Sequence, residues 1–152
     1  LGYVQTADSL LMLQRKREPF TGYWTAPGGK LREGESPREA LVREIYEETQ
    51  LRVEEAHLRL IASEIGPDYY CWLLFGFAVY GWSGQLGRTD EGQLAWLRKD
   101  QLDQVYIPEV DRAVLPYVLE PPRGQVYLAR IRYGEGGSLL SLEIETLERR
   151  SR

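Results

Sequence analysis

Residues 29–51, GKLREGESPREALVREIYEETQL, constrain this chain more than any other stretch. Within them, Glu44, Glu47 and Glu48 fall inside five positions. Positions three and four apart are neighbours on a helix surface, so the pattern predicts three carboxylates on one helical face. Their mutual repulsion suits a hard divalent cation such as Mg²⁺, which prefers oxygen ligands. The stretch therefore indicates metal-assisted chemistry on an anionic substrate, and the alternative is a solvated helix whose glutamates have no function.

The predicted helix carries its own start signals. Ser36 is expected at the N-cap and Pro37 at the first helical position, while Glu39 completes a capping box. An apolar stripe beside the acidic one is formed by Ala40, Leu41 and Ile45. The preceding turn at 27–29, Pro-Gly-Gly, predicts backbone that comes close to a neighbouring group. A glycine turn followed by a helix with one acidic face is the local arrangement that we expect.

The whole stretch resembles the Nudix box, G-x5-E-x7-R-E-U-x-E-E-x-G-U, in which U is an aliphatic residue. The chain supplies eight matching residues, namely Gly29, Glu35, Arg43, Glu44, Ile45, Glu47, Glu48 and Leu51. The family's late glycine is replaced by Gln50. That glycine is expected to be a left-handed helix C-cap, where glutamine costs about 1 kcal/mol, unless the turn is built differently. The preceding segment 24–30, WTAPGGK, is typical of the MutT-like branch of the family.

The segments around the box predict an α+β protein. We expect strands at 1–5, 10–14, 58–66, 70–80, 94–97, 125–133 and 139–147. A short helical piece is expected at 99–105, and a second helix is expected to end near 119. Helices among many strands favour the α+β class. The resemblance implies the Nudix fold, a mixed β-sheet sandwiched between helices, with the strand at 70–80 at its centre.

Composition narrows the function. The 152 residues are expected to form a single domain, 1–152. A net charge of −4 without an obvious basic patch argues against a nucleic acid polymer as partner. The single cysteine, Cys71, excludes an intrachain disulfide framework and predicts a reducing compartment, the cytoplasm. No membrane span is expected, because the longest apolar run, 72–82, is too short. A monomer and a homodimer are both compatible with the sequence.

The resemblance implies a metal site that draws on more than the helix. A backbone carbonyl of the glycine turn and one later glutamate commonly join the helical carboxylates in this family. Residues 90–96 of this chain, DEGQLAW, resemble the stretch that carries the later glutamate. The alternative for that glutamate is a loop carboxylate in solvent. The implied ligands of Mg²⁺, with Mn²⁺ as a possible substitute, are Gly28, Glu44, Glu47, Glu48 and Glu91.

The resemblance also implies roles in catalysis. Water attacks a phosphorus of the substrate, and a carboxylate accepts its proton. The catalytic residues are expected among Glu44, Glu47 and Glu48, with Glu44 and Glu48 as the candidate bases. Glu35 and Arg43 are expected to hold the geometry of loop and helix behind the metal ligands.

Five residues are expected to bind substrate. Arg15 contacts phosphate or base, or else belongs to a solvated loop edge, and Lys30 steadies a phosphate or a box carboxylate. Glu109 and Asp111 are expected to read a purine edge, because carboxylates accept hydrogen bonds from ring N–H and amino groups. The alternative for both is helix capping. Thr25 occupies the position of an asparagine in the related enzymes.

Three functions remain open at this point. The C-terminal half resembles enzymes that hydrolyse oxidised purine nucleoside triphosphates. This implies a Mg²⁺-dependent hydrolase that releases a nucleoside monophosphate and pyrophosphate, sanitising nucleotides of the 8-oxo-dGTP type. The first alternative is a pyrophosphatase acting on ADP-ribose or dinucleoside polyphosphates. The second is a non-catalytic nucleotide-sensing module, although such modules commonly lose the box carboxylates that this chain keeps.

Overall fold

Two β-sheets and two α-helices make up most of the protein in this computed structural model, which describes residues 1–68 and 70–147. The five-stranded sheet has the order β1-β5-β4-β7-β8, and the three-stranded sheet has the order β3-β2-β6. The strands are β1 (Gly2–Val4), β2 (Ser9–Arg15), β3 (Trp24–Thr25), β4 (Arg52–Ile65), β5 (Cys71–Ser83), β6 (Gly92–Arg98), β7 (Tyr127–Tyr133) and β8 (Leu139–Thr146). The helices are α1 (Pro37–Thr49), α2 (Glu109–Leu119) and the 3₁₀ segments η1 (Lys99–Gln104) and η2 (Glu135–Gly137).

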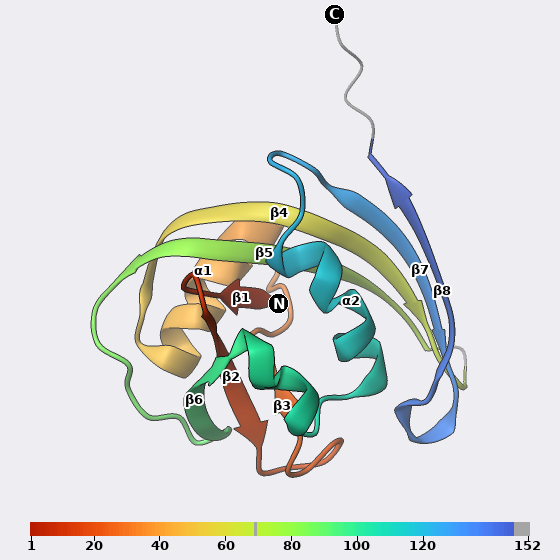
Figure 1. Ribbon diagram of the computed structural model, residues 1–152, viewed down its shortest axis with the longest axis horizontal. Coiled ribbons are helices and arrows are strands. Elements are labelled where there is room, and N and C mark those ends of the chain that lie inside the picture. The colour runs from red at the N-terminus through yellow and green to blue at the C-terminus, as the bar shows by residue number, and fades with distance from the viewer. Residues whose placement is uncertain (69, 148–152) are drawn as a thin grey trace, which may run out of the picture.

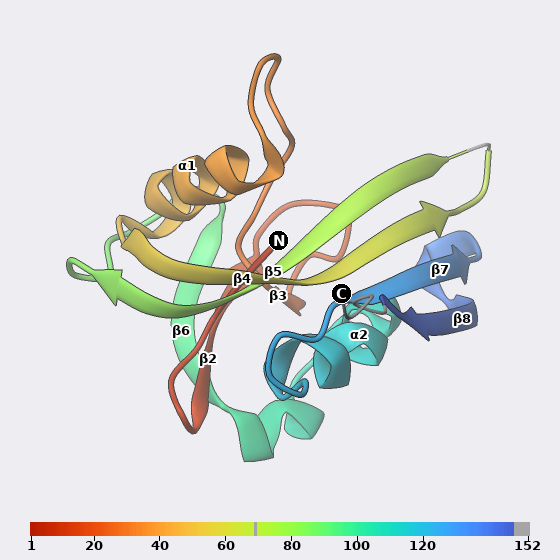
Figure 2. The ribbon, with the colours of Figure 1, turned by 90° about the horizontal axis from the view of Figure 1, so that it is seen from above.

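The five-stranded sheet is mixed and lies between the two α-helices. Its β1–β5 and β4–β7 pairs are parallel, whereas its β4–β5 and β7–β8 pairs are antiparallel. Figure 2 shows α1 and α2 on opposite sides of β4 and β5. The predicted α+β architecture is confirmed. The strand predicted at the centre, β5, has a neighbour on each side, but β4 holds the middle position because the short β1 lies outside β5.

Each helix packs against a different apolar cluster on the sheet. Leu41 and Ile45 of α1 pack in one cluster with Phe77 of β5. Val114 of α2 packs in a second cluster with Leu60 of β4. Figure 1 shows α2 running along the near side of the sheet and α1 behind it. Within the described part of the chain, no helix combines the length and apolar character needed to cross a membrane.

The start of α1 is as predicted, and its end explains the departure at Gln50. The Ser36 hydroxyl accepts a hydrogen bond from the Glu39 amide at 3.2 Å, and the Glu39 carboxylate accepts one from the Ser36 amide at 2.8 Å. Gln50 takes the left-handed conformation, with φ 63° and ψ 9°, and its amide donates to the Tyr46 carbonyl at 2.8 Å. The left-handed cap is therefore retained with glutamine in it, and the alternative of a differently built turn is wrong.

The start of α2 differs from the prediction. Pro108 is its N-cap, and no side chain caps the helix. Asp111 lies inside the first turn, so the capping alternative for Asp111 is wrong. The same holds for Glu109, whose carboxylate accepts a hydrogen bond from the Leu139 amide at 2.7 Å and so joins the helix to β8. Because Pro108 fixes where the helix begins, the Asp111 side chain is left for another role.

Candidate active site

The acidic face of α1 borders a cleft of about 380 Å³. Its opposite wall is the loop that precedes β6. The residues that line the cleft are Glu44, Glu47, Glu48, Arg88, Thr89, Asp90 and Glu91. The loop is held by backbone contacts, because the Glu91 carbonyl accepts from the Lys16 amide at 3.2 Å and the Glu91 amide donates to the Thr89 hydroxyl at 3.1 Å. The fold therefore brings Glu91 to the same cleft as the three helical glutamates.

Glu48 is a partly buried carboxylate of this cleft. Burial, together with the negative charges of Glu44 and Glu91, raises the pKa of Glu48 to about 7. The Gly28 amide, which donates to Glu48 Oε2 at 2.9 Å, and the charge of Arg15 act in the opposite direction. The carboxylates thus lie near enough to repel one another, and a cation between them would relieve that repulsion.

Arg43 binds the other carboxylates of the helix. Its Nη1 donates to Glu44 Oε1 at 2.6 Å and to Glu47 Oε2 at 3.1 Å. Its Nε and Nη2 donate to the two oxygens of Glu35, and Nη2 also reaches the Lys30 carbonyl at 3.0 Å. The hydrogen bond from Arg43 and another from a backbone amide lower the pKa of Glu35 to about 2. One guanidinium therefore ties the loop before the helix to two glutamates of the cleft.

The donor set fits a hard divalent cation, although the ligands are not already gathered. Within residues 1–68 and 70–147, no group of three or more His, Cys, Asp or Glu side chains is placed to hold a metal ion as it stands. All the acidic donors of the cleft are carboxylate oxygens, which is the chemistry that Mg²⁺ requires. In the described part of the chain, Glu48 and Glu91 have no cationic partner, so their charge is available to a metal.

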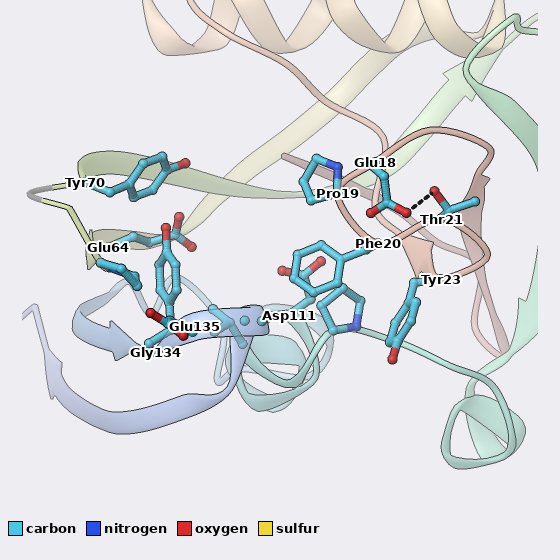
Figure 3. A pocket seen from close by; sticks show the side chains of 16 residues that line it. Glu18, Pro19, Phe20, Thr21, Tyr23, Glu64, Tyr70, Asp111, Gly134 and Glu135 are labelled. Atoms are coloured by element: carbon cyan, nitrogen blue, oxygen red, sulfur yellow. Dashed lines mark hydrogen bonds between the residues drawn. The ribbon is translucent and has the colours of Figure 1, made fainter.

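A larger cavity, of about 640 Å³, opens beside α2. Figure 3 shows Phe20 and Tyr23 on one side of it, Tyr70 and Glu64 on the other, and Asp111 between them. Four aromatic side chains line the cavity, namely Phe20, Tyr23, Tyr70 and Tyr133. Apolar walls with a few polar groups are the usual composition of a small-molecule pocket.

Four carboxyl groups line this cavity, those of Glu18, Glu64, Asp111 and Glu135. Glu64 and Asp111 differ from the other two in that burial changes their pKa values. Burial, together with the charge of Glu64, raises the pKa of Asp111 to about 7, although the charges of Arg15 and of the Leu1 ammonium oppose the shift. Burial also raises the pKa of Glu64. The prediction included Asp111 but missed Glu64. Glu64 could have been found from the alternation of side chains along β4, which places Leu60, Ala62 and Glu64 on the face that packs on the core.

The charge of Arg15 acts on both sites. The Arg15 Nε donates to the Pro19 carbonyl at 2.7 Å, which orients the guanidinium at the end of β2. Its positive charge opposes the raised pKa of both Glu48 in the cleft and Asp111 in the cavity. The guanidinium is therefore within electrostatic reach of both.

The remaining predicted residues lie elsewhere. The Lys30 ammonium is 4.6 Å from the centre of the Trp72 ring, and among the described residues it forms no ion pair with a box carboxylate. In this structure the ammonium therefore contacts an aromatic face and not a box carboxylate, and the predicted role of Lys30 stays a prediction. Thr25 belongs to β3 and does not line either cavity as described. Glu109 does not line the larger cavity, since its carboxylate is bound to the Leu139 amide.

The comparison with known families explains this arrangement. A family model described as the NUDIX domain matches residues 2–118, which include α1, the cleft and Asp111. The chain belongs to the Nudix family. Nudix hydrolases act on phosphoanhydride bonds of nucleotide substrates and generally use divalent metal ions such as Mg²⁺.

Individual relatives support the MutT-like branch. The crystal structure of a mutator MutT protein from Bacillus halodurans superposes with a TM-score of 0.84 and 31% identity, covering 95% of this chain and 94% of that one. The uncharacterized Nudix hydrolase YvcI of Bacillus subtilis is 30% identical over 122 residues, 77% of this chain and 75% of that protein. The 8-oxo-dGTP diphosphatase of Proteus vulgaris is 38% identical over 65 residues, 43% of this chain and 57% of that protein. The predicted Nudix fold is therefore confirmed.

Proposed function

We propose that the protein is a Mg²⁺-dependent Nudix hydrolase that cleaves a nucleoside triphosphate to a nucleoside monophosphate and pyrophosphate, with 8-oxo-dGTP-type nucleotides as substrates. The observation that carries the proposal is the pair of cavities, a carboxylate cleft along α1 and an aromatic cavity beside α2. The charge of Arg15, at the end of β2, acts on Glu48 in the cleft and on Asp111 in the cavity. A metal-binding cleft and an aromatic pocket within reach of one cation suit a ligand with phosphates at one end and a base at the other.

In this proposal, the cation supplies charge that the protein lacks. Glu44, Glu47, Glu48, Glu91 and the Gly28 carbonyl would hold Mg²⁺, which would supply positive charge to polarise the phosphoryl oxygens and to neutralise the charge that develops on them. Glu47 and Glu44 are oriented by Arg43, which is itself anchored on Glu35. The contact between Arg43 and Glu35 matters because residues behind the metal ligands orient those ligands.

Glu48 is the better placed of the two candidate bases. Glu44 is bonded to Arg43 at 2.6 Å, whereas no arginine binds Glu48 in the described structure. The Gly28 amide fixes one oxygen of Glu48, and the other remains available to take a proton from water. We therefore assign proton abstraction to Glu48 in addition to its contact with the metal, and metal binding with electrostatic support to Glu44 and Glu47.

The base of the nucleotide is placed in the larger cavity. Aromatic rings such as Phe20 and Tyr23 offer faces for a planar base, and Asp111 offers hydrogen-bond acceptors. Strands β7 and β8 follow the segment matched by the family model, yet β7 pairs with β4 and β8 with β7, and Tyr133 of β7 lines the cavity. The whole chain, 1–152, is therefore proposed to act as one domain.

A substrate panel tests the proposal. The purified protein is incubated with Mg²⁺ and 8-oxo-dGTP, the four ordinary dNTPs, ADP-ribose or diadenosine polyphosphates, and the products are separated by ion-exchange chromatography. The expected result is preferential conversion of 8-oxo-dGTP to 8-oxo-dGMP and pyrophosphate. A preference for ADP-ribose or a dinucleotide would overturn the assigned substrate. Absence of Mg²⁺-dependent turnover on every compound would favour a nucleotide-sensing module.

A further inference from the structure

The aromatic cavity is lined by Glu64, which lies outside the Nudix box and has no role so far. Glu64 comes from β4 and Asp111 from α2, and both line the cavity. Both side chains are partly buried, and neither carboxyl group forms a hydrogen bond or an ion pair with another described residue. A carboxylate withdrawn from water is costly unless donors approach it. Two such groups facing one cavity therefore create a demand for donors that a ligand can meet.

A third polar group without a partner lies beside them. Tyr3 of β1 is only 1% exposed, and its hydroxyl has no hydrogen-bond partner in the described structure. Burial raises the pKa of Tyr3, and the charges of Asp111 and Glu64 raise it further, so the hydroxyl lies near both carboxyl groups. Three elements thus bring polar groups to one place at the edge of the apolar core.

The fold explains why these groups converge. Leu60 and Ala62 precede Glu64 on the same face of β4, and both pack in the core cluster with Val114 of α2. Asp111 lies about one turn before Val114 on that helix. Both carboxyl groups therefore lie where the cover provided by α2 ends and the core opens into the cavity. Figure 3 shows Glu64 and Asp111 directed into the same space.

We infer that Glu64 is a specificity-determining residue, which together with Asp111 selects a base whose edge carries neighbouring N–H donors, as a 2-amino-6-oxopurine does. This inference rests on the proposed function. Such a purine presents its ring N1–H beside an exocyclic amino group, and these donors favour the ionised form of the carboxyl groups, which only accepts. An adenine edge places a ring-nitrogen acceptor beside its amino group, so one carboxylate would face a lone pair. The aromatic walls bind any planar base, and the two carboxyl groups make the choice.

Substrates that differ in a single donor provide the test. dGTP and dITP differ only in the 2-amino group, so the ratio of their kcat/KM values measures how strongly that donor is read. The wild type is expected to favour dGTP by about tenfold or more, as for hydrogen bonds to charged groups. Glu64→Gln keeps the size of the side chain and one acceptor oxygen, but replaces the other oxygen with an amino group that donates. It is expected to lower that ratio at least about fivefold and to raise the kcat/KM for dATP relative to that for dGTP.

The matched control is Glu54→Gln, an exposed carboxylate on the same strand that lies outside both cavities. It should leave the dGTP to dITP ratio unchanged. An unchanged ratio in Glu64→Gln, in a protein that hydrolyses triphosphates, would overturn the inference alone. A wild type that hydrolyses no triphosphate would instead overturn the proposed function.

Binding without chemistry supplies an independent measurement. The affinities of wild-type protein for dGMP and dIMP are compared by isothermal titration calorimetry, which needs no turnover and no stable variant. The inference predicts tighter binding of dGMP, with most of the difference lost in Glu64→Gln. Equal affinities of the wild type for the two nucleotides would refute it even if Glu64→Gln did not fold.

Discussion

Replacing Gln50 with glycine tests the structural account of the end of α1. Gln50 holds the left-handed C-cap, with φ 63°, which costs a residue with a Cβ about 1–2 kcal/mol. Glycine removes that strain but gives the unfolded chain more freedom, at a cost of about 0.4–1 kcal/mol. Gln50→Gly is therefore expected to raise the free energy of unfolding by about 0.5–1 kcal/mol.

A contact with the loop at Gly87 opposes this gain in stability, because the glycine variant loses it. The Gln50 side chain lies directly over Gly87, where an added Cβ would collide with Gln50 Cδ. Gln50→Ala is the matched control, because it removes this cover and keeps the Cβ in the left-handed conformation. The difference between the glycine and alanine variants then isolates the backbone strain, which should be about 1 kcal/mol in favour of glycine.

Thermal unfolding followed by circular dichroism, with urea unfolding as a second probe, measures these differences. For a chain of this length, the glycine variant should melt about 1–4 °C above the wild type. Its kcat should match that of the wild type, since Gln50 does not line the carboxylate cleft as described. A glycine variant that melts no higher than the alanine variant would refute the reasoning about the cap.

Three further predictions concern the site. Arg43→Lys keeps a positive charge but loses the fork that binds Glu35, so the Mg²⁺ concentration for half-maximal activity should rise about tenfold or more; an unchanged Mg²⁺ titration would contradict this role. Between about pH 4 and pH 7, folded Asp111 holds a proton that the unfolded chain releases, so the free energy of unfolding should fall as pH rises. Urea unfolding should show that the free energy of unfolding falls less over this pH window in Asp111→Asn than in the wild type, by on the order of 2 kcal/mol. An equal fall with pH in the two proteins would count against the burial of that carboxyl group. Lys30→Ala should change kcat/KM less than about twofold, because the ammonium lies over Trp72, and a tenfold loss in steady-state assays would restore its predicted phosphate contact.

Local signals predicted α1 well. The Ser36 cap and the Glu39 capping box depend on contacts within four residues, and the helix formed as expected. The acidic face follows in the same way from helical spacing. Glu91 could be associated with that face only through resemblance to a family, since loop and helix are far apart in sequence.

The contacts that sequence reasoning missed are between distant elements. Glu64 and Asp111 meet because β4 and α2 pack with one particular register, which no local pattern specifies. The position of Asp111 depended on whether the helix begins at Pro108 or three residues later. The direction of Lys30 was decided by Trp72 of β5, a residue that becomes its neighbour only in the folded chain.

The most direct test of the central claim is pyrophosphate release from 8-oxo-dGTP as Mg²⁺ is added to metal-free protein. Wild type, Glu48→Gln and the control Glu54→Gln are measured side by side, with circular dichroism confirming that each is folded. The account predicts turnover that requires Mg²⁺, products limited to 8-oxo-dGMP and pyrophosphate, and a loss of about 100-fold or more in kcat for Glu48→Gln alone. Release that is independent of Mg²⁺, or a Glu48→Gln variant as active as the wild type, would contradict it.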